Sequence, residues 1–159
     1  MQFAPLTYDD LIFLLEVRND CRDMLHDDRK FTLEECEQWF RTTRPDFRII
    51  RRDVEPIGYF RLSNHDRGDA SIYVGADLHS RFRGKGLGTE AYETFLPLVR
   101  DEFQVATFRL EVLSHNTVAI QLYQKLGFVE SRRETASVVR HGAVVDNIFM
   151  EKPALTPSS

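Results

Sequence analysis

The chain has 159 residues, 42% of them hydrophobic and 29% charged, with a formal net charge of −4. This length and composition are typical of one globular domain and exclude a disordered chain. The acidic balance argues against a protein that wraps a nucleic-acid backbone, and no apolar run approaches the roughly 20 residues that a membrane span needs. We therefore expect neither nucleic acid nor a membrane as a partner.

The cysteines and the two ends of the sequence indicate the expected cellular compartment and the expected limits of the domain. The two cysteines, Cys21 and Cys36, form no CxxC pair and lie near no histidine at zinc-ligand spacing, so no metal site is expected. Two unpaired thiols and the absence of a basic, apolar leader favour the cytoplasm. We expect a single domain over residues 1–152 and a short flexible tail over residues 153–159, which hold two prolines and two serines.

The N-terminal half is predicted to begin with a strand, followed by two helices and three strands. Thr7 with Asp10, and Thr32 with Glu35, have the spacing of capping boxes, and each pair precedes a stripe of apolar residues at helical intervals. A polar turn is expected over residues 64–69. Alternating apolar residues predict strands over residues 2–6, 47–52, 57–63 and 70–78.

The C-terminal half is predicted to alternate helices and strands. A long helix follows the glycines near residue 86, and Asn116 and Gly127 have the residue types that begin and end a second helix. A hairpin is expected around His141-Gly142. Strands are predicted over residues 108–113, 128–140 and 144–152. The resulting order is β-α-α-β-β-β-α-β-α-β-β, with short parallel pairing expected in the two late β-α-β stretches.

Residues 81–89, with the sequence RFRGKGLGT, are the most informative segment. Alternating glycines after a strand allow a tight turn that brings backbone N–H groups close to a ligand. The helix that follows adds unpaired N–H groups and the positive end of its dipole, which favours a phosphate or pyrophosphate. The segment lacks the GxxxxGK[ST] pattern of a P-loop and the GxGxxG pattern of a dinucleotide fold.

Two blocks of this sequence resemble the GNAT superfamily of acetyl-CoA-dependent N-acetyltransferases. Arg83-x-x-Gly86-x-Gly88 is similar to the family's Q/R-x-x-G-x-G/A signature. The second block, residues 110–128, contains LEV followed by N-x-x-A-x-x-L-Y-x-x-L-G-F and resembles the family's second conserved segment. The resemblance implies an α/β fold of the mixed α+β kind. Its mostly antiparallel, twisted sheet of six to seven strands is splayed between the fourth and fifth strands and flanked by four helices.

The resemblance also implies where acetyl-CoA, the expected co-substrate, is held. The loop backbone would bind the pyrophosphate, the end of the preceding strand would line the pantetheine and offer main-chain groups to the acetyl carbonyl, and Asn116 would contact the pantetheine arm. The implied binding residues are Ala76, Asp77, Leu78, Arg83, Gly84, Lys85, Gly86, Leu87, Gly88, Thr89 and Asn116.

Acetyl transfer to an amine needs a proton acceptor for the ammonium and a proton donor for the leaving thiolate. Tyr123 matches the family's proton donor, although a tyrosine on an apolar helix stripe is otherwise a core residue. Glu111, in LEV, matches the proton acceptor of some relatives. Others use a glutamate in the strand before the glycine loop, where this chain has Ser71. A chain of waters, Glu34 or Glu35 are the alternatives for this proton acceptor.

The acceptor is expected to contact the N-terminal helices. Arg18, Asn19 and Arg22 suit a phosphate or sugar, whereas the pairs at residues 27–28 and 34–35 suit a cationic amine. We expect acetyl transfer to a primary amine, preferably of a small molecule or an amino sugar, and a homodimer is compatible with the resemblance. The alternatives are an acetyltransferase for protein N-termini, such as those of ribosomal proteins, and a non-catalytic module that senses acyl-CoA.

Overall fold

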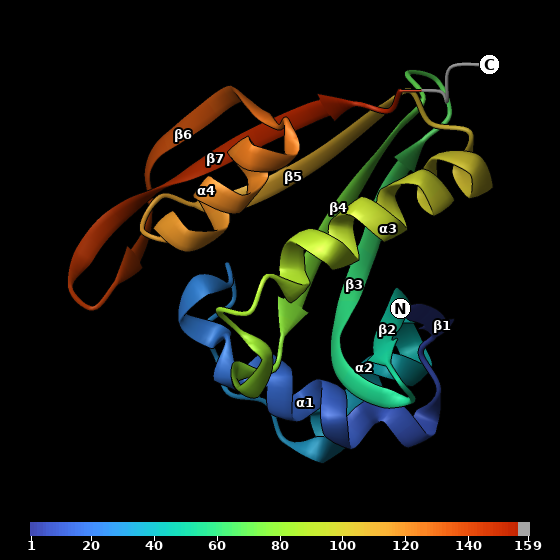
Figure 1. The fold of residues 1–159 in the computed structure, drawn as a ribbon. Helices are drawn as coiled ribbons and strands as arrows, with labels where there is room; N and C mark the ends of the chain where they lie inside the picture. Colours follow the sequence, from blue (N-terminus) through green and yellow to red (C-terminus); the bar gives the residue numbers. More distant parts are fainter. Residues whose placement is uncertain (156–159) are drawn as a thin grey trace.

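The computed structural model describes residues 1–155, so residues 156–159 of the expected tail lie outside the described residues. The chain forms one seven-stranded sheet with helices packed on both faces (Figure 1). No helix within residues 1–155 combines the length and apolarity needed to cross a membrane. The helices are α1 (Leu11–Asp20), α2 (Leu33–Thr43), α3 (Leu87–Phe103) and α4 (Thr117–Leu126), with short 3-10 helices η1 (Tyr8–Asp10), η2 (Arg22–Met24) and η3 (Ser80–Phe82). The strands are β1 (Gln2–Pro5), β2 (Asp46–Arg52), β3 (Glu55–Asp66), β4 (Ser71–Leu78), β5 (Thr107–Leu113), β6 (Val129–Arg140) and β7 (Ala143–Pro153).

The sheet has the strand order β1-β2-β3-β4-β5-β7-β6 and is antiparallel except between β4 and β5. The expected fold class is thus confirmed, but one of the two expected parallel pairings is wrong. β5 and β6 are not neighbours, because β7 lies between them and pairs with β5 over all seven residues of that strand. An antiparallel ladder of that length is more favourable than a short parallel one.

The two faces of the sheet bury separate sets of apolar side chains. On one face, α3 and α4 pack on β3, β4 and β5 through a large cluster that includes Phe60, Phe95 and Leu110. On the other face, α1 and α2 pack on β2 and β3 through a smaller cluster that includes Leu14 and Tyr59. Figure 1 shows α1 and α2 gathered at one end of the sheet, leaving β5, β6 and β7 without a helix on that face.

Local sequence signals explain where the helices begin and end. Both predicted capping boxes are present, and Gly127 ends α4 with a positive φ of 101°. The first box precedes η1, which leads directly into α1. The expected turn over residues 64–69 is too long, because β3 continues to Asp66 through a register shift next to Asn64, whose φ is 50°.

Candidate active site

β4 and β5 pair only from Ser71 to Tyr73 and from Thr107 to Arg109, and then diverge (Figure 1). We call the diverging parts, residues 74–78 and 110–113, the splay. The closed end is fixed by polar contacts, because Ser71 Oγ donates to Asp69 at 2.5 Å and Arg109 Nη1 donates to both. Ser71 therefore lies in a structural network at the closed end of the splay.

The splay leaves backbone groups of β4 without a strand partner. His79 N donates to Ile57 O at 2.9 Å, and Leu78 is opposite Gly58 in the β3–β4 register. Hydrogen-bonded and non-hydrogen-bonded pairs alternate in antiparallel strands, so the N–H and C=O groups of Ala76 and Leu78 point away from β3. They point toward the side where β5 has diverged, which makes this strand end a source of directed hydrogen-bond donors and acceptors.

The glycine loop lies directly after this strand end. Gly84 and Gly86 have φ values of 72° and 76°, and a Cβ at either position would meet no atom within 4 Å. Leu87 is buried and anchors the first turn of α3, whereas Lys85 is exposed and Thr89 is half-buried. Gly88 faces Leu122 and Leu78, where a Cβ would make ordinary contacts. The open loop and the N-terminus of a 17-residue helix together present unpaired backbone N–H groups to one point.

The Arg83 side chain connects the end of β4 to α1. Its guanidinium donates from Nε to Leu78 O at 3.1 Å and from Nη2 to Cys21 Sγ at 2.8 Å, and it lies 3.3 Å from an Asp20 carboxylate oxygen. Burial raises the pKa of the Cys21 thiol to about 12, so the thiol remains neutral. In this structure the Arg83 side chain therefore holds the end of β4 against the end of α1.

Tyr123 lies at the side of the splay covered by α3 and α4. Its ring packs edge-on against Tyr92 and Phe128, and its hydroxyl accepts a hydrogen bond from Tyr92 Oη at 3.4 Å. Burial raises the pKa of Tyr123 above its usual value near 10, with the Tyr92 hydrogen bond acting in the opposite direction. The hydroxyl therefore keeps its proton at neutral and moderately alkaline pH. Asn116 is the N-cap of α4, with its side chain accepting from Ala119 N at 3.4 Å.

Glu111 is exposed on β5, two residues beyond the last residue that pairs with β4. Its Oε1 accepts a hydrogen bond from Asn147 Nδ2 at 3.0 Å, and Asn147 Oδ1 is 2.7 Å from Nε2 of His26. This chain of contacts connects Glu111 to the segment between α1 and α2. Glu34 is exposed, and the Glu35 carboxylate accepts from Thr32 N in the cap of α2.

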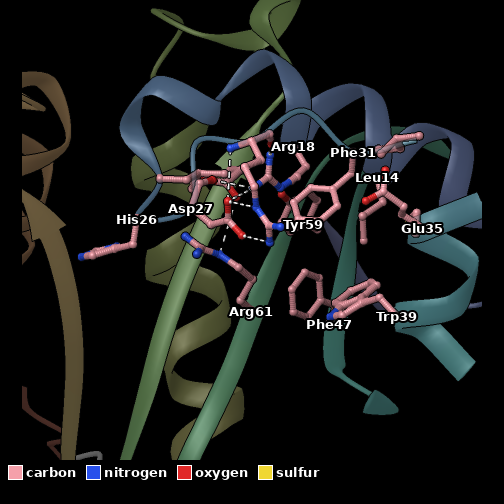
Figure 2. A pocket seen from close by; sticks show the side chains of 15 residues that line it. Leu14, Arg18, His26, Asp27, Phe31, Glu35, Trp39, Phe47, Tyr59 and Arg61 are labelled. Atoms are coloured by element: carbon pink, nitrogen blue, oxygen red, sulfur yellow. Dashed lines mark hydrogen bonds and ion pairs between the residues drawn. The ribbon is translucent and has the colours of Figure 1, made fainter. Parts of the chain in front are cut away.

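A cavity of about 470 Å³ lies on the α1 and α2 face of the sheet and reaches Asp77 and Arg61. Figure 2 shows aromatic side chains on the α2 side, with charged side chains opposite them. The aromatic group comprises Phe31, Trp39, Phe47 and Tyr59. The charged group comprises Arg18, His26, Asp27, Arg29, Arg61 and Asp77, and Glu35 lies on the α2 side. The side chain of Asp77 thus lines this cavity, whereas the backbone groups of Ala76 and Leu78 point into the splay.

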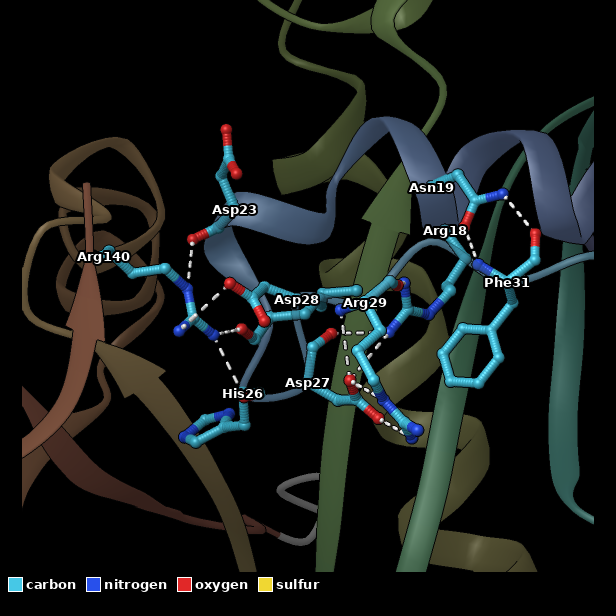
Figure 3. A network of polar contacts seen from close by, with 10 residues as sticks. Arg18, Asn19, Asp23, His26, Asp27, Asp28, Arg29, Phe31 and Arg140 are labelled. Atoms are coloured by element: carbon cyan, nitrogen blue, oxygen red, sulfur yellow. Dashed lines mark hydrogen bonds and ion pairs between the residues drawn. The ribbon is translucent and has the colours of Figure 1, made fainter. Parts of the chain in front are cut away.

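The segment between α1 and α2 closes one side of the cavity and is held by side chains from distant elements (Figure 3). Arg140, buried at the end of β6, donates to the carbonyl oxygens of Asp23, Leu25 and His26. Asn19 exchanges two hydrogen bonds with the backbone of Phe31. The cavity therefore depends on contacts between both arms of the splayed sheet.

Replacing Arg140 with methionine tests this anchoring. We expect a loss of about 2 kcal/mol in unfolding free energy and faster amide hydrogen exchange in residues 22–28, because several charge-assisted hydrogen bonds disappear. The matched control is Arg67→Met in the exposed β3–β4 turn. If exchange of residues 22–28 in Arg140→Met equals that of the wild type, this arginine does not hold the segment.

Comparisons with known proteins agree with this geometry. A sequence profile described as an acetyltransferase (GNAT) domain matches residues 1–129. The chain is 39% identical over 64 residues to the uncharacterized N-acetyltransferase YdgE of Bacillus subtilis (strain 168), and the match spans 40% of each chain. Its fold is similar to spermidine N-acetyltransferase from Vibrio cholerae, solved in complex with CoA and spermine, at 18% identity, a TM-score of 0.88 and coverage of 96% and 95%. It is also similar to ribosomal-protein-alanine N-acetyltransferase from Brucella melitensis, at 21% identity, a TM-score of 0.79 and coverage of 96% and 99%.

Proposed function

The chain belongs to the GNAT acetyltransferase family, and we propose that it transfers the acetyl group of acetyl-CoA to a primary amine of a small molecule held in the cavity. One observation carries this proposal. The splay, with its directed backbone groups, lies between the open glycine loop and the cavity that reaches Asp77. A pyrophosphate-bearing thioester and an amine can thus approach the same strand end from two sides.

The residues of the splay and loop fit acetyl-CoA. The positive φ values and open surroundings of Gly84 and Gly86 allow close approach of a pyrophosphate to the loop backbone and the start of α3. In this proposal, the outward N–H groups of Ala76 and Leu78 bind pantetheine and polarise the thioester carbonyl. Acetyl-CoA supplies an activated acetyl group: a C–N bond forms to the amine, and the C–S bond breaks to release CoA thiol.

The proposed proton donor is Tyr123. Because burial raises the pKa of its hydroxyl, Tyr123 is still protonated when the thiolate leaves, and its hydroxyl donates a proton to the departing sulfur. The phenolate then regains a proton from the acylated nitrogen. Before the amine attacks, its ammonium form must lose a proton. The proposed proton acceptor is Glu111, which is exposed and hydrogen-bonded to Asn147. One proton is released to solvent in each complete reaction.

Replacing Glu111 with glutamine tests its role. The variant should depend on the small fraction of acceptor that is already unprotonated, so kcat/KM should rise about tenfold per pH unit below the amine pKa near 10. The wild type should show a weaker dependence over the same range. A pH–rate profile identical to that of the wild type would remove Glu111 from the mechanism.

The size of the cavity, about 470 Å³, and its partial cover favour a small acceptor over a folded protein. Its outer side is covered by residues 22–31, which Arg140 and Asn19 tie down. The direct test is release of CoA thiol from acetyl-CoA across amino acids, polyamines, amino sugars and N-terminal peptides. We expect turnover with small amines. Tight CoA binding without turnover in the whole panel would instead indicate a sensor module, and turnover with peptides alone would indicate a protein acceptor.

A further inference from the structure

The charged end of the cavity contains an ion pair whose geometry is incomplete. Asp77 is 9% exposed, and its Oδ2 lies 3.5 Å from Nε of Arg61. Both atoms are enclosed, and neither has a hydrogen-bond partner among residues 1–155. Buried polar atoms are nearly always paired, and a guanidinium and a carboxylate have more donors and acceptors than one such contact uses. The Arg61 side chain as a whole is 39% exposed and that of Asp77 9%, so the remaining donors and acceptors of the pair are open to a ligand.

The backbone beside the pair is shaped to hold Arg61 there. Gly75 is opposite Arg61 in the β3–β4 register, and a Cβ at Gly75 would lie 2.8 Å from Arg61 Nη2. The absence of a side chain thus lets the guanidinium lie across β4, next to Asp77. The other charged groups of the cavity are engaged elsewhere. Arg29 pairs with Asp27, Arg18 donates to backbone carbonyls, and the Glu35 carboxylate accepts from Thr32 N.

The opposite end of the cavity is mainly aromatic, with Glu35 on the same side. Trp39 packs edge-on against Phe47 with ring centroids 5.1 Å apart, and Phe47 stacks on Tyr59 at 5.3 Å. Figure 2 shows these rings on one side of the cavity and Arg61 on the charged side. A ligand that fills the cavity therefore meets one cationic and one anionic group close together, and an aromatic surface beyond them.

We propose that the acceptor is a free α-amino acid with an aromatic or large aliphatic side chain, an inference that rests on the proposed function. Its ammonium binds Asp77, its carboxylate binds Arg61, and its side chain packs against Trp39 and Phe47. The adjacent charges of such a headgroup match the adjacent charges of the ion pair. A polyamine would place further ammonium groups near Arg61 and Arg18, and a peptide N-terminus lacks the neighbouring carboxylate.

Four ligands of related structure test this proposal in the wild type. L-Phenylalanine, L-phenylalaninamide, phenethylamine and spermidine are compared by thiol release and by calorimetric titration into the CoA-saturated protein. We expect phenylalanine to exceed phenethylamine and the amide by about 10- to 100-fold in kcat/KM and in affinity, as is typical of hydrogen bonds to a charged partner. The proposal would be overturned if kcat/KM and affinity were equal for phenylalanine and phenethylamine, or if both were higher for spermidine.

Variants then test the assignment of each group. Arg61→Gln should remove the preference for phenylalanine over phenethylamine, and Gly75→Ala should weaken it by displacing the guanidinium without changing any charge. The matched control, Arg67→Gln, should retain the preference. If phenylalanine is not acetylated while other amines are, this inference alone is overturned. Failure to bind CoA would contradict the proposed function itself.

Discussion

Replacing Tyr123 with phenylalanine is expected to lower kcat by roughly 100- to 10,000-fold, the range that general acid catalysis typically contributes. The KM for acetyl-CoA should change little, because the ring and its contacts with Tyr92 and Phe128 remain. Stability should also be nearly unchanged, since the lost hydrogen bond is a long one of 3.4 Å. Steady-state kinetics and thermal unfolding measure these effects separately.

The neighbouring tyrosine gives a matched comparison. Tyr92→Phe removes the donor to the Tyr123 hydroxyl but leaves that hydroxyl in place, so it should lower kcat less than Tyr123→Phe. Because burial raises the pKa of Tyr123, the wild-type rate should not fall on the alkaline side until above pH 10. Full turnover in Tyr123→Phe would show that this hydroxyl is dispensable.

Replacing Gly86 with alanine is expected to weaken CoA binding at least tenfold. Gly86 has a φ of 76°, which costs a residue with a Cβ roughly 1 kcal/mol, and the new methyl group would project into the space where the pyrophosphate is proposed to bind. Gly142, in the β6–β7 hairpin, is a matched control because it has a φ of 78° and equally open surroundings.

The two glycine variants separate backbone strain from loss of the binding site. Both should lose a similar, small amount of thermal stability, because each forces a side chain into the left-handed region. Only Gly86→Ala should lose affinity in a calorimetric titration with CoA. Equal affinity in the two variants would mean that this loop does not hold the pyrophosphate.

Local signals made much of the fold predictable from the sequence. Capping boxes, the helix-ending Gly127 and the alternation of apolar residues depend on neighbours within a few positions. The resemblance of residues 83–88 and 110–128 to one family then gave the position of the splay. The placement of β7 between β5 and β6 was not predictable, because β6 and β7 could each pair with β5 and no local signal in the sequence decides between them.

The candidate site was predictable for its backbone but less so for its side chains. Alternation along β4 predicts that the side chains of Gly75 and Asp77 lie on the opposite face from those of Ala76 and Leu78. The positions of Arg61 and Arg140 had no local signal, since each contacts residues far away in the sequence. The side-chain contacts of Arg83 likewise had no local signal, since its guanidinium pairs with the end of α1.

Amide hydrogen exchange of the full chain with and without CoA tests the central proposal most directly, because it reports both binding and its location. Saturating CoA should slow exchange at Ala76, Leu78 and residues 84–89, where backbone N–H groups lack a partner before binding. Exchange that is unchanged throughout, or slowed only around residues 22–31, would contradict a cofactor site in the splay.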